Sequence, residues 1–145
     1  SLEELFSRRK LNSAEVLEAS YFQNALLINK GHFEFELQAL PWQAQLSPLK
    51  DAVVVNANND QFPDVLTVGN FYENNVEMGR YDADFGTILV NNGHGFVAGE
   101  SINGLQVKGQ TRHIKKIMLA NKSEAFVLAR NNDSTMVIQF KVPKK

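Results

Sequence analysis

From residue 21 onward, apolar and polar residues alternate in short runs that are typical of β-strands. The clearest run is Phe33-Glu34-Phe35-Glu36-Leu37, in which every second side chain is apolar, so one strand face is apolar and the other polar. Segments rich in Asn and Gly separate these runs, and both residue types accept the left-handed backbone of tight turns. The pattern predicts strands at residues 25–29, 33–37, 52–55, 65–68, 87–90, 96–97, 114–120, 125–129 and 136–140, and therefore an all-β body.

The N-terminal residues follow a different pattern. Leu2, Leu5 and Phe6 are spaced as on one face of a helix, and the basic residues 8–10 suit a helix C-terminus. We therefore expect one short helix around residues 2–9, whereas residues 13–20 fit a helix or a strand equally well. The chain is thus divided into an N-terminal helix or linker, residues 1–20, and a β body, residues 21–145.

Two pairs of similar segments indicate an internal repeat. Residues 27–33 resemble residues 89–96 at an offset of 62, and residues 65–70 resemble residues 126–131 at an offset of 61. Four strands in a repeat of about sixty residues are typical of a β-propeller blade. The chain then supplies two strands of one four-stranded antiparallel blade (residues 23–40), a whole blade (51–100) and three strands of another (105–141). This is about two blades of a partial propeller. The alternative is a chance match between Asn-Gly hairpins.

A partial propeller has strand edges without a neighbour. Edge-strand self-association is therefore expected, and the remaining blades of a longer parent chain are the first expected partners. Trp42, which follows Pro41, is expected to fill a gap between blades.

Composition narrows the functional classes. The 145 residues include no Cys, which excludes disulfide scaffolds, Cys-based zinc sites, iron–sulfur clusters and Cys nucleophiles. A formal net charge of −1 argues against sequence-independent binding of nucleic acid, which needs a surplus of Lys and Arg. No apolar run approaches the roughly 18 residues of a membrane span, and a hydrophobic content of 43% is enough for a folded core.

One loop has the spacing of a calcium site. In residues 56–64, oxygen-bearing side chains occupy positions 1, 3, 5 and 9, and position 7 offers a backbone carbonyl. This spacing in a tight loop directs oxygens to one point, and Ca²⁺ takes roughly 6–8 oxygen ligands. The candidate metal ligands are Asn56, Asn58, Asp60, Phe62 through its carbonyl, and Asp64.

This loop resembles the D-x-N-x-D-G-x-x-D loop of FG-GAP and VCBS repeats, which build integrin-α-like β-propellers. Further segments between residues 17 and 141 are similar, as an ordered set, to the C-terminal segment of exported VCBS-repeat proteins. These proteins are related to the ASPIC/UnbV group and are common in Bacteroidetes. The resemblance implies a propeller fold and an extracellular, cell-surface or periplasmic location. The segments are Leu40-Pro41, Ala44-Gln45-Leu46-Ser47-Pro48, Val68-Gly69-Asn70-Phe71-Tyr72, Gly79-Arg80-Tyr81-Asp82-Ala83, Phe85-Gly86 and Ala129-Arg130-Asn131-Asn132-Asp133.

The loop departs from the family pattern at two positions. Asn56 stands where the family has its first Asp, and Gln61 stands where it has Gly. Lower ligand charge weakens Ca²⁺ binding, and a side chain in place of Gly makes a positive-φ turn costlier. The loop is therefore either a weak Ca²⁺ site or a metal-free turn in which Asn56, Asn58 and Asp60 bond backbone amides.

A second candidate site comprises Arg80, Tyr81 and Asp82, which follow the polar residues 73–77. These residue types suit a carbohydrate or peptide ligand. Alternatively, Arg80 pairs with Asp82 or Asp84 and only orders the loop. The sequence contains no Ser/His/Asp set, phosphate-binding loop or His pair of a metal hydrolase.

These features together predict a non-catalytic protein. We expect part of an exported or cell-surface FG-GAP/VCBS-like propeller that binds a protein or glycan or serves as a scaffold. Weakly bound Ca²⁺ is the one cofactor expected. The alternative is a set of blades accessory to a larger enzyme whose active site lies outside this chain.

Overall fold

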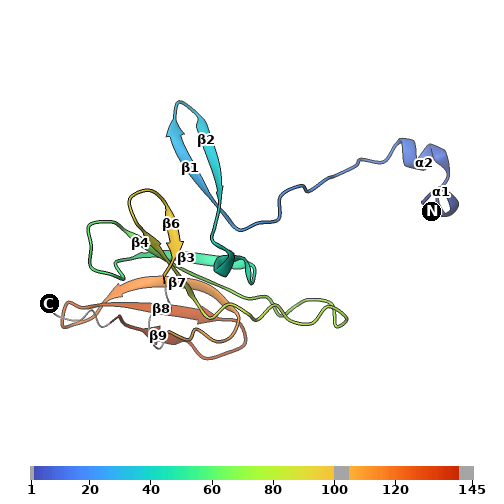
Figure 1. The fold of residues 1–145 in the computed structure, drawn as a ribbon. Helices are drawn as coiled ribbons and strands as arrows, with labels where there is room; N and C mark the ends of the chain where they lie inside the picture. Colours follow the sequence, from blue (N-terminus) through green and yellow to red (C-terminus); the bar gives the residue numbers. More distant parts are fainter. Residues whose placement is uncertain (1, 100–104, 141–145) are drawn as a thin grey trace.

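The computed structural model describes residues 2–99 and 105–140 and is mostly β (Figure 1). Within these residues the strands form three antiparallel sheets: the first sheet is β1–β2, the second β3–β4–β5–β6 and the third β7–β8–β9. Every predicted strand is present. Segments 23–40, 51–100 and 105–141 were expected to supply two, four and three strands, and these numbers are confirmed. The predicted β body also includes residues 100–104 and 141–145, which lie outside the described residues. The strands are β1 Ala25–Gly31, β2 Glu34–Ala39, β3 Leu49–Val55, β4 Asp64–Gly69, β5 Thr87–Asn91, β6 Phe96–Ala98, β7 Thr111–Met118, β8 Glu124–Arg130 and β9 Met136–Ile138.

At the N-terminus the prediction of one helix is wrong, because two short helices form. Helix α1 is Leu2–Leu5 and helix α2 is Arg8–Asn12. Ser7 separates them, since its backbone is extended, with ψ at 146°. Neither helix contains a buried residue, and both lie far from the sheets at the end of an extended segment (Figure 1). Residues 13–20 form neither helix nor strand. Among the described residues, no helix is long and apolar enough to cross a membrane.

Two hairpins recur among the three sheets, each with the same pairing register. A bulge at Lys50 interrupts β3–β4, and a bulge at Arg112, 62 residues later, interrupts β7–β8. Every pair of β3–β4 has a counterpart in β7–β8 that lies 62 residues later on one strand and 61 later on the other. The same offsets relate the pairs of β5–β6 to pairs of β1–β2. Two different hairpins are thus repeated with the same pairing register.

The turns of β1–β2 and β5–β6 share one side-chain hydrogen bond. The side-chain Oδ1 of Asn29 accepts the N–H of Gly31 at 2.8 Å, and Oδ1 of Asn91 accepts the N–H of Gly93 at 2.9 Å. Both glycines have positive φ, 86° and 82°, which glycine adopts without steric cost. The sequence similarity between these segments therefore reflects the same side-chain hydrogen bond from Asn to Gly, although the β1–β2 turn is one residue longer and adds positive φ at His32 and Phe33.

Each sheet has two faces, because residues paired across antiparallel strands share a face. We call one face of each sheet its front face. In the first sheet the front face carries Leu26 and Ile28. The equivalent face carries Val53, Leu66 and Ile88 in the second sheet and Lys115, Val127 and Val137 in the third. The back face carries Leu27, Phe35 and Leu37 in the first sheet, Val65, Leu89 and Phe96 in the second, and Ile114, Phe126 and Leu128 in the third.

Two apolar clusters hold the sheets together. In the larger cluster, Leu66 and Ile88 on the front face of the second sheet pack with Phe126 and Leu128 on the back face of the third. In the smaller, Leu89 on the back face of the second sheet packs with Leu26 of the first sheet, together with Leu40 and Ala44, which follow it. Leu66, Leu89 and Leu128 are fully buried, and each contributes about 1.5–3 kcal/mol.

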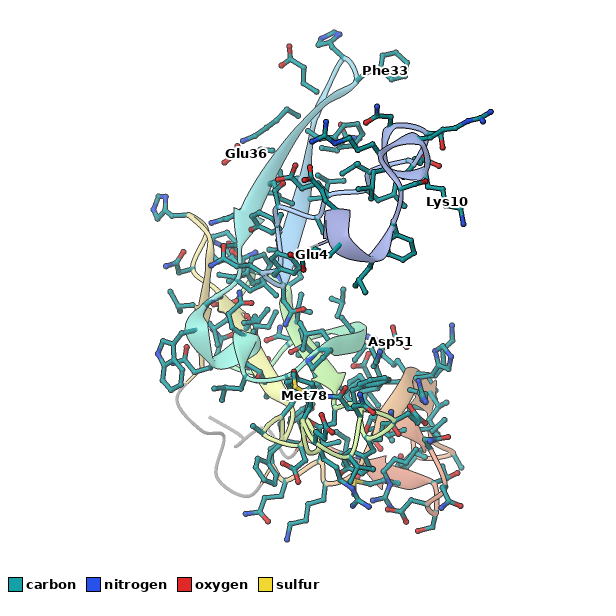
Figure 2. The ribbon with its side chains drawn as sticks, turned by 90° about the vertical axis from the view of Figure 1, so that its right-hand side faces the viewer. Glu4, Lys10, Phe33, Glu36, Asp51 and Met78 are labelled. Atoms are coloured by element: carbon teal, nitrogen blue, oxygen red, sulfur yellow. The ribbon has the colours of Figure 1, made fainter. Side chains whose placement is uncertain are left out.

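A polar contact supports the same packing where β3 and β7 lie side by side. Asp51 Oδ2 accepts the backbone N–H of Ile114 at 2.9 Å and lies 3.4 Å from His113 Nδ1 (Figure 2). The carboxylate thus connects the second sheet to a backbone donor of the third.

The expectation for Trp42 is wrong. It begins the 3₁₀ helix Trp42–Gln45 and its side chain is 68% exposed. Ala44 of the same turn faces the core instead and is buried. Gln45 holds the turn in place, because its side chain exchanges hydrogen bonds of 2.8 Å with the backbone N–H and carbonyl of Asn24.

Candidate functional site

The 56–64 loop joins β3 to β4, and the buried carboxylate of Asp64 closes it. Asp64 Oδ2 accepts the N–H of Ala57 at 2.8 Å, and Oδ1 accepts the N–H of Asn91 at 2.9 Å. The Phe62 ring lies against Gly93, where an added Cβ would come within 2.9 Å of the ring. The loop is therefore fastened to the turn between β5 and β6.

The exposed residues of this loop bond to one another. Asp60 Oδ1 accepts the N–H of Phe62 and Oδ2 accepts Nδ2 of Asn58, both at 2.7 Å. Asn58 Oδ1 accepts the N–H of Asp60 at 3.1 Å, and Asn56 Nδ2 donates to the Asp60 carbonyl at 2.9 Å. The positive φ of the loop, 60°, falls on Asn59, a residue type that accepts it readily.

All five predicted metal ligands belong to this one loop. The side-chain oxygens of Asn58, Asp60 and Asp64 already accept hydrogen bonds from the loop itself or from Asn91. Across residues 2–99 and 105–140, no group of three or more His, Cys, Asp or Glu side chains is placed to hold a metal. Amide and backbone carbonyl oxygens also bind Ca²⁺, so weak binding here stays a prediction.

An open pocket of about 270 Å³ lies beside the loop, and the loop supplies part of its wall through Asn56 and Phe62. Lys116 and Glu124 of the third sheet line the other side and form an ion pair of 3.0 Å. The pocket therefore combines amide, ammonium and carboxylate groups at the junction of two sheets.

The 70–86 loop joins β4 to β5 and extends beyond the ends of the strands (Figure 1). Two buried side chains, Asn70 and Asp84, hold its base. Asn70 Nδ2 donates to the carbonyls of Asp84 and Gly109 at 2.8 and 3.0 Å, and its Oδ1 accepts the N–H of Asp84 at 3.0 Å. Asn70 has φ at 79°, which Asn tolerates better than most side chains.

Asp84 carries a buried carboxyl group. Burial raises the pKa of Asp84 above its ordinary value, because the charged form loses contact with water. The N–H of Gly86 at 3.1 Å and the hydroxyl of Thr87 at 3.4 Å donate to Oδ1 and oppose that shift. The carboxyl thus orders the end of the loop, where β5 begins.

Glu73 fastens the same loop to the third sheet. Its carboxylate accepts hydrogen bonds from Gln110 at 2.9 Å, from Arg112 at 2.7 and 2.8 Å, and from Asn131 at 2.7 Å. The hydrogen bond from Gln110, joined by the Arg112 guanidinium, holds the pKa of Glu73 below its usual value, although partial desolvation opposes the shift. The stem of the loop therefore rests on a polar network contributed by three segments.

The predicted contact residues, Arg80, Tyr81 and Asp82, lie in the second half of this loop, which leads back to β5. Tyr81 pairs through its backbone with Phe71, each N–H donating to the other's carbonyl at 2.9 Å, and its side chain is 41% exposed. The Arg80 guanidinium lies 5.0 Å from the centre of the Tyr72 ring, within cation–π range. Asp82 is exposed.

The alternative prediction, in which Arg80 pairs with Asp82 or Asp84, is wrong. Among the described residues, Arg80 forms no ion pair with Asp82 or Asp84, and it is ordered by Tyr72 instead. Beyond this pair, the tip of the loop exposes apolar side chains, with Val76 97% and Met78 67% accessible. An anchored stem thus carries an exposed, partly apolar tip.

Sequence reasoning missed the residues that anchor this loop. Asn70 and Gly109 are 39 residues apart, and Glu73 and Asn131 are 58 apart, so no local pattern reveals either contact. Asp84 did leave a local signal, because Asp84-Phe85-Gly86 has the same spacing of an Asn or Asp and a Gly that forms the side-chain-bonded turns at Asn29 and Asn91.

No protein-family model, curated protein or solved structure matches this chain. The likeness to FG-GAP and VCBS repeats therefore rests on the sequence segments quoted above.

Proposed function

We propose that this chain is a non-catalytic scaffold of stacked β-sheets that presents the 70–86 loop to a protein or glycan ligand. It would form part of an exported or cell-surface propeller of the FG-GAP/VCBS type. The observation that carries this proposal is that one long, anchored loop departs from an otherwise regular repeat.

The shared register supports the repeat. Bulges 62 residues apart, at Lys50 and Arg112, are features that a chance likeness between hairpins does not require. Bulges bend strands and tend to be designed features of a fold. A second sheet of four strands in a simple meander is also the arrangement that a propeller blade needs.

The connection between the second and third strands supports the binding role. In the second sheet it comprises residues 70–86, whereas the corresponding connection in the third sheet comprises only residues 131–135. A short turn is therefore enough to join these two strands, and the extra length of the 70–86 loop is not needed for strand pairing. Long loops on a rigid scaffold commonly carry binding function.

The anchoring of the loop is the second line of support. Asn70, Glu73 and Asp84 fix its stem to two sheets, which lowers the conformational entropy lost when a ligand binds. Val76 and Met78 at the tip remain exposed. Met adapts readily to irregular partner surfaces, and Arg and Tyr are enriched at binding hot spots.

Calcium has a minor place in this proposal. The 56–64 loop would bind Ca²⁺ weakly through Asn56, Asn58, Asp60, Asp64 and the Phe62 carbonyl. Its internal hydrogen bonds already hold the loop, so the ion would stiffen an ordered turn and would not be needed for folding.

Labelled chain applied to a glycan array and to a phage-displayed peptide library tests the binding role. We expect a selected ligand to lose about tenfold or more in affinity with Arg80→Ala and with Tyr81→Ala. Arg9→Ala and Tyr21→Ala are matched controls, because both residues are exposed outside the loop, and they should bind as the wild type does. Binding that survives both loop substitutions would contradict the proposal, as would the absence of any ligand in both libraries.

A further inference from the structure

The second and third sheets stack front to back, and the base of the first sheet packs toward the second in the same direction. The front face of the first sheet, through Leu26, packs toward Leu89 on the back face of the second. The front face of the second sheet, through Ile88, packs against Leu128 on the back face of the third. Both interfaces therefore join a front face to a back face, which is a head-to-tail arrangement.

This stacking leaves the back face of the first sheet uncovered. Leu27, Phe35 and Leu37 on that face are 64%, 56% and 52% exposed. Leu89 stands 62 residues after Leu27, at the same position of the repeated hairpin, and is fully buried. The hairpin β1–β2 stands away from the other sheets, with Phe33 at its tip (Figures 1 and 2). The position that Leu89 occupies in the second sheet is therefore covered, whereas the equivalent position of Leu27 in the first sheet is open.

The opposite end of the stack leaves a front face uncovered. Val127 and Val137 pair across β8–β9 in the third sheet, as Leu66 and Ile88 pair across β4–β5 in the second. Ile88 is 5% exposed, whereas Val137 is 60% exposed. Lys115 shares this face, and its aliphatic stem can lie along apolar surface while the ammonium group reaches water.

We infer that the occupant of each open face is a second copy of this chain. The back face of the first sheet in one copy stacks on the front face of the third sheet in another. The chain already forms this front-to-back contact in full between its second and third sheets and in part, through Leu26, between its first and second sheets, so a further contact of the same kind continues the series. Exposed apolar patches of this kind mark interaction surfaces. Because the contact is heterologous, each copy keeps one face open, and assembly proceeds to a ring or an open series.

Sedimentation velocity of the 145-residue chain at concentrations from micromolar to about 0.5 mM tests this inference. We expect the wild type to form dimers and larger species as concentration rises. Leu37→Glu and Val137→Glu each place a charge on one of the two faces, and each should raise the apparent dissociation constant about tenfold or more. Both side chains are exposed, so the variants should fold. Val76→Glu, on the tip of the 70–86 loop, is the matched control and should associate as the wild type does.

Mixing the two variants gives the sharpest outcome. Leu37→Glu keeps its third sheet intact and Val137→Glu keeps its first sheet intact, so the mixture should form a heterodimer that grows no further. A wild type that stays monomeric over the whole range would overturn the inference. Association that both variants retain would indicate pairing of strand edges and would overturn it equally. Neither result bears on ligand binding by the 70–86 loop, which is tested separately.

Discussion

The carboxylate of Asp64 should contribute more to stability than any other side chain of the 56–64 loop. Asp64→Ala removes the acceptor of two N–H groups, those of Ala57 and Asn91, at a position that is fully buried. Each orphaned donor costs about 1–3 kcal/mol when water cannot replace the lost partner. Because both hydrogen bonds are only partly buried, we expect a total loss of about 2–4 kcal/mol. For a chain of this size that lowers Tm by about 5–15 °C.

Asp60→Ala is the matched control, because it also removes a carboxylate that accepts two hydrogen bonds in the same loop. Asp60 is exposed, so water replaces the lost acceptor and the loss should stay below about 1 kcal/mol. Urea denaturation followed by circular dichroism, with EDTA present to remove any Ca²⁺, measures both variants. Equal losses for the two would refute the reasoning, because burial would then not decide the cost.

Three further predictions concern Ca²⁺ and pH. If the 56–64 loop has a dissociation constant of about 1 mM, typical of weak extracellular sites, about 5 mM Ca²⁺ stabilises the fold by about 1 kcal/mol. Differential scanning fluorimetry should then show a rise in Tm of about 2–4 °C, lost in Asp60→Asn; a flat response would exclude the site. The pKa of Glu73 is lowered on folding, so its contribution is present above its ordinary value of 4.5 and is lost as pH falls through the folded pKa. Glu73→Gln should remove that part of the acid sensitivity in urea titrations at stepped pH; an unchanged profile would contradict this. The pKa of Asp84 is raised, so its effect has the opposite sign, and stability falls as pH rises from 3.8 through the folded pKa. Asp84→Asn keeps an acceptor for Gly86 and should at pH 7 be as stable as the wild type or more so; a loss above about 2 kcal/mol would show that the charge itself is required.

The strands could be predicted from the sequence because their signal is local. Alternation over five residues, as in Phe33 to Leu37, depends only on which side of the strand each side chain occupies. The turns at Asn29 and Asn91 were equally visible, since the bonded residues lie two positions apart. The repeat followed from the same local features occurring twice.

The anchors of the candidate sites could not be predicted, because they join residues that are distant in sequence. The position of Asp64 in the loop was evident, but its bond to Asn91, 27 residues away, depends on how the second sheet folds. The prediction for Trp42 failed for the same reason. The packing of the turn at Gln45 decides that Ala44, and not Trp42, faces the core. At the N-terminus, the apolar spacing was real, but within the described part of the chain neither helix buries a residue, and the helix breaks at Ser7.

We propose above all that an ordered scaffold presents the tip of the 70–86 loop to a ligand. The most direct test replaces residues 74–79 by Asn-Gly, which leaves Asn70, Glu73, Asp84 and the Phe71–Tyr81 pair in place. The measurement is the affinity of this variant for the glycan or peptide selected with the wild type, by surface plasmon resonance. We predict that Tm stays within about 2 °C of the wild type while binding is lost. Wild-type affinity in the shortened variant would contradict the claim.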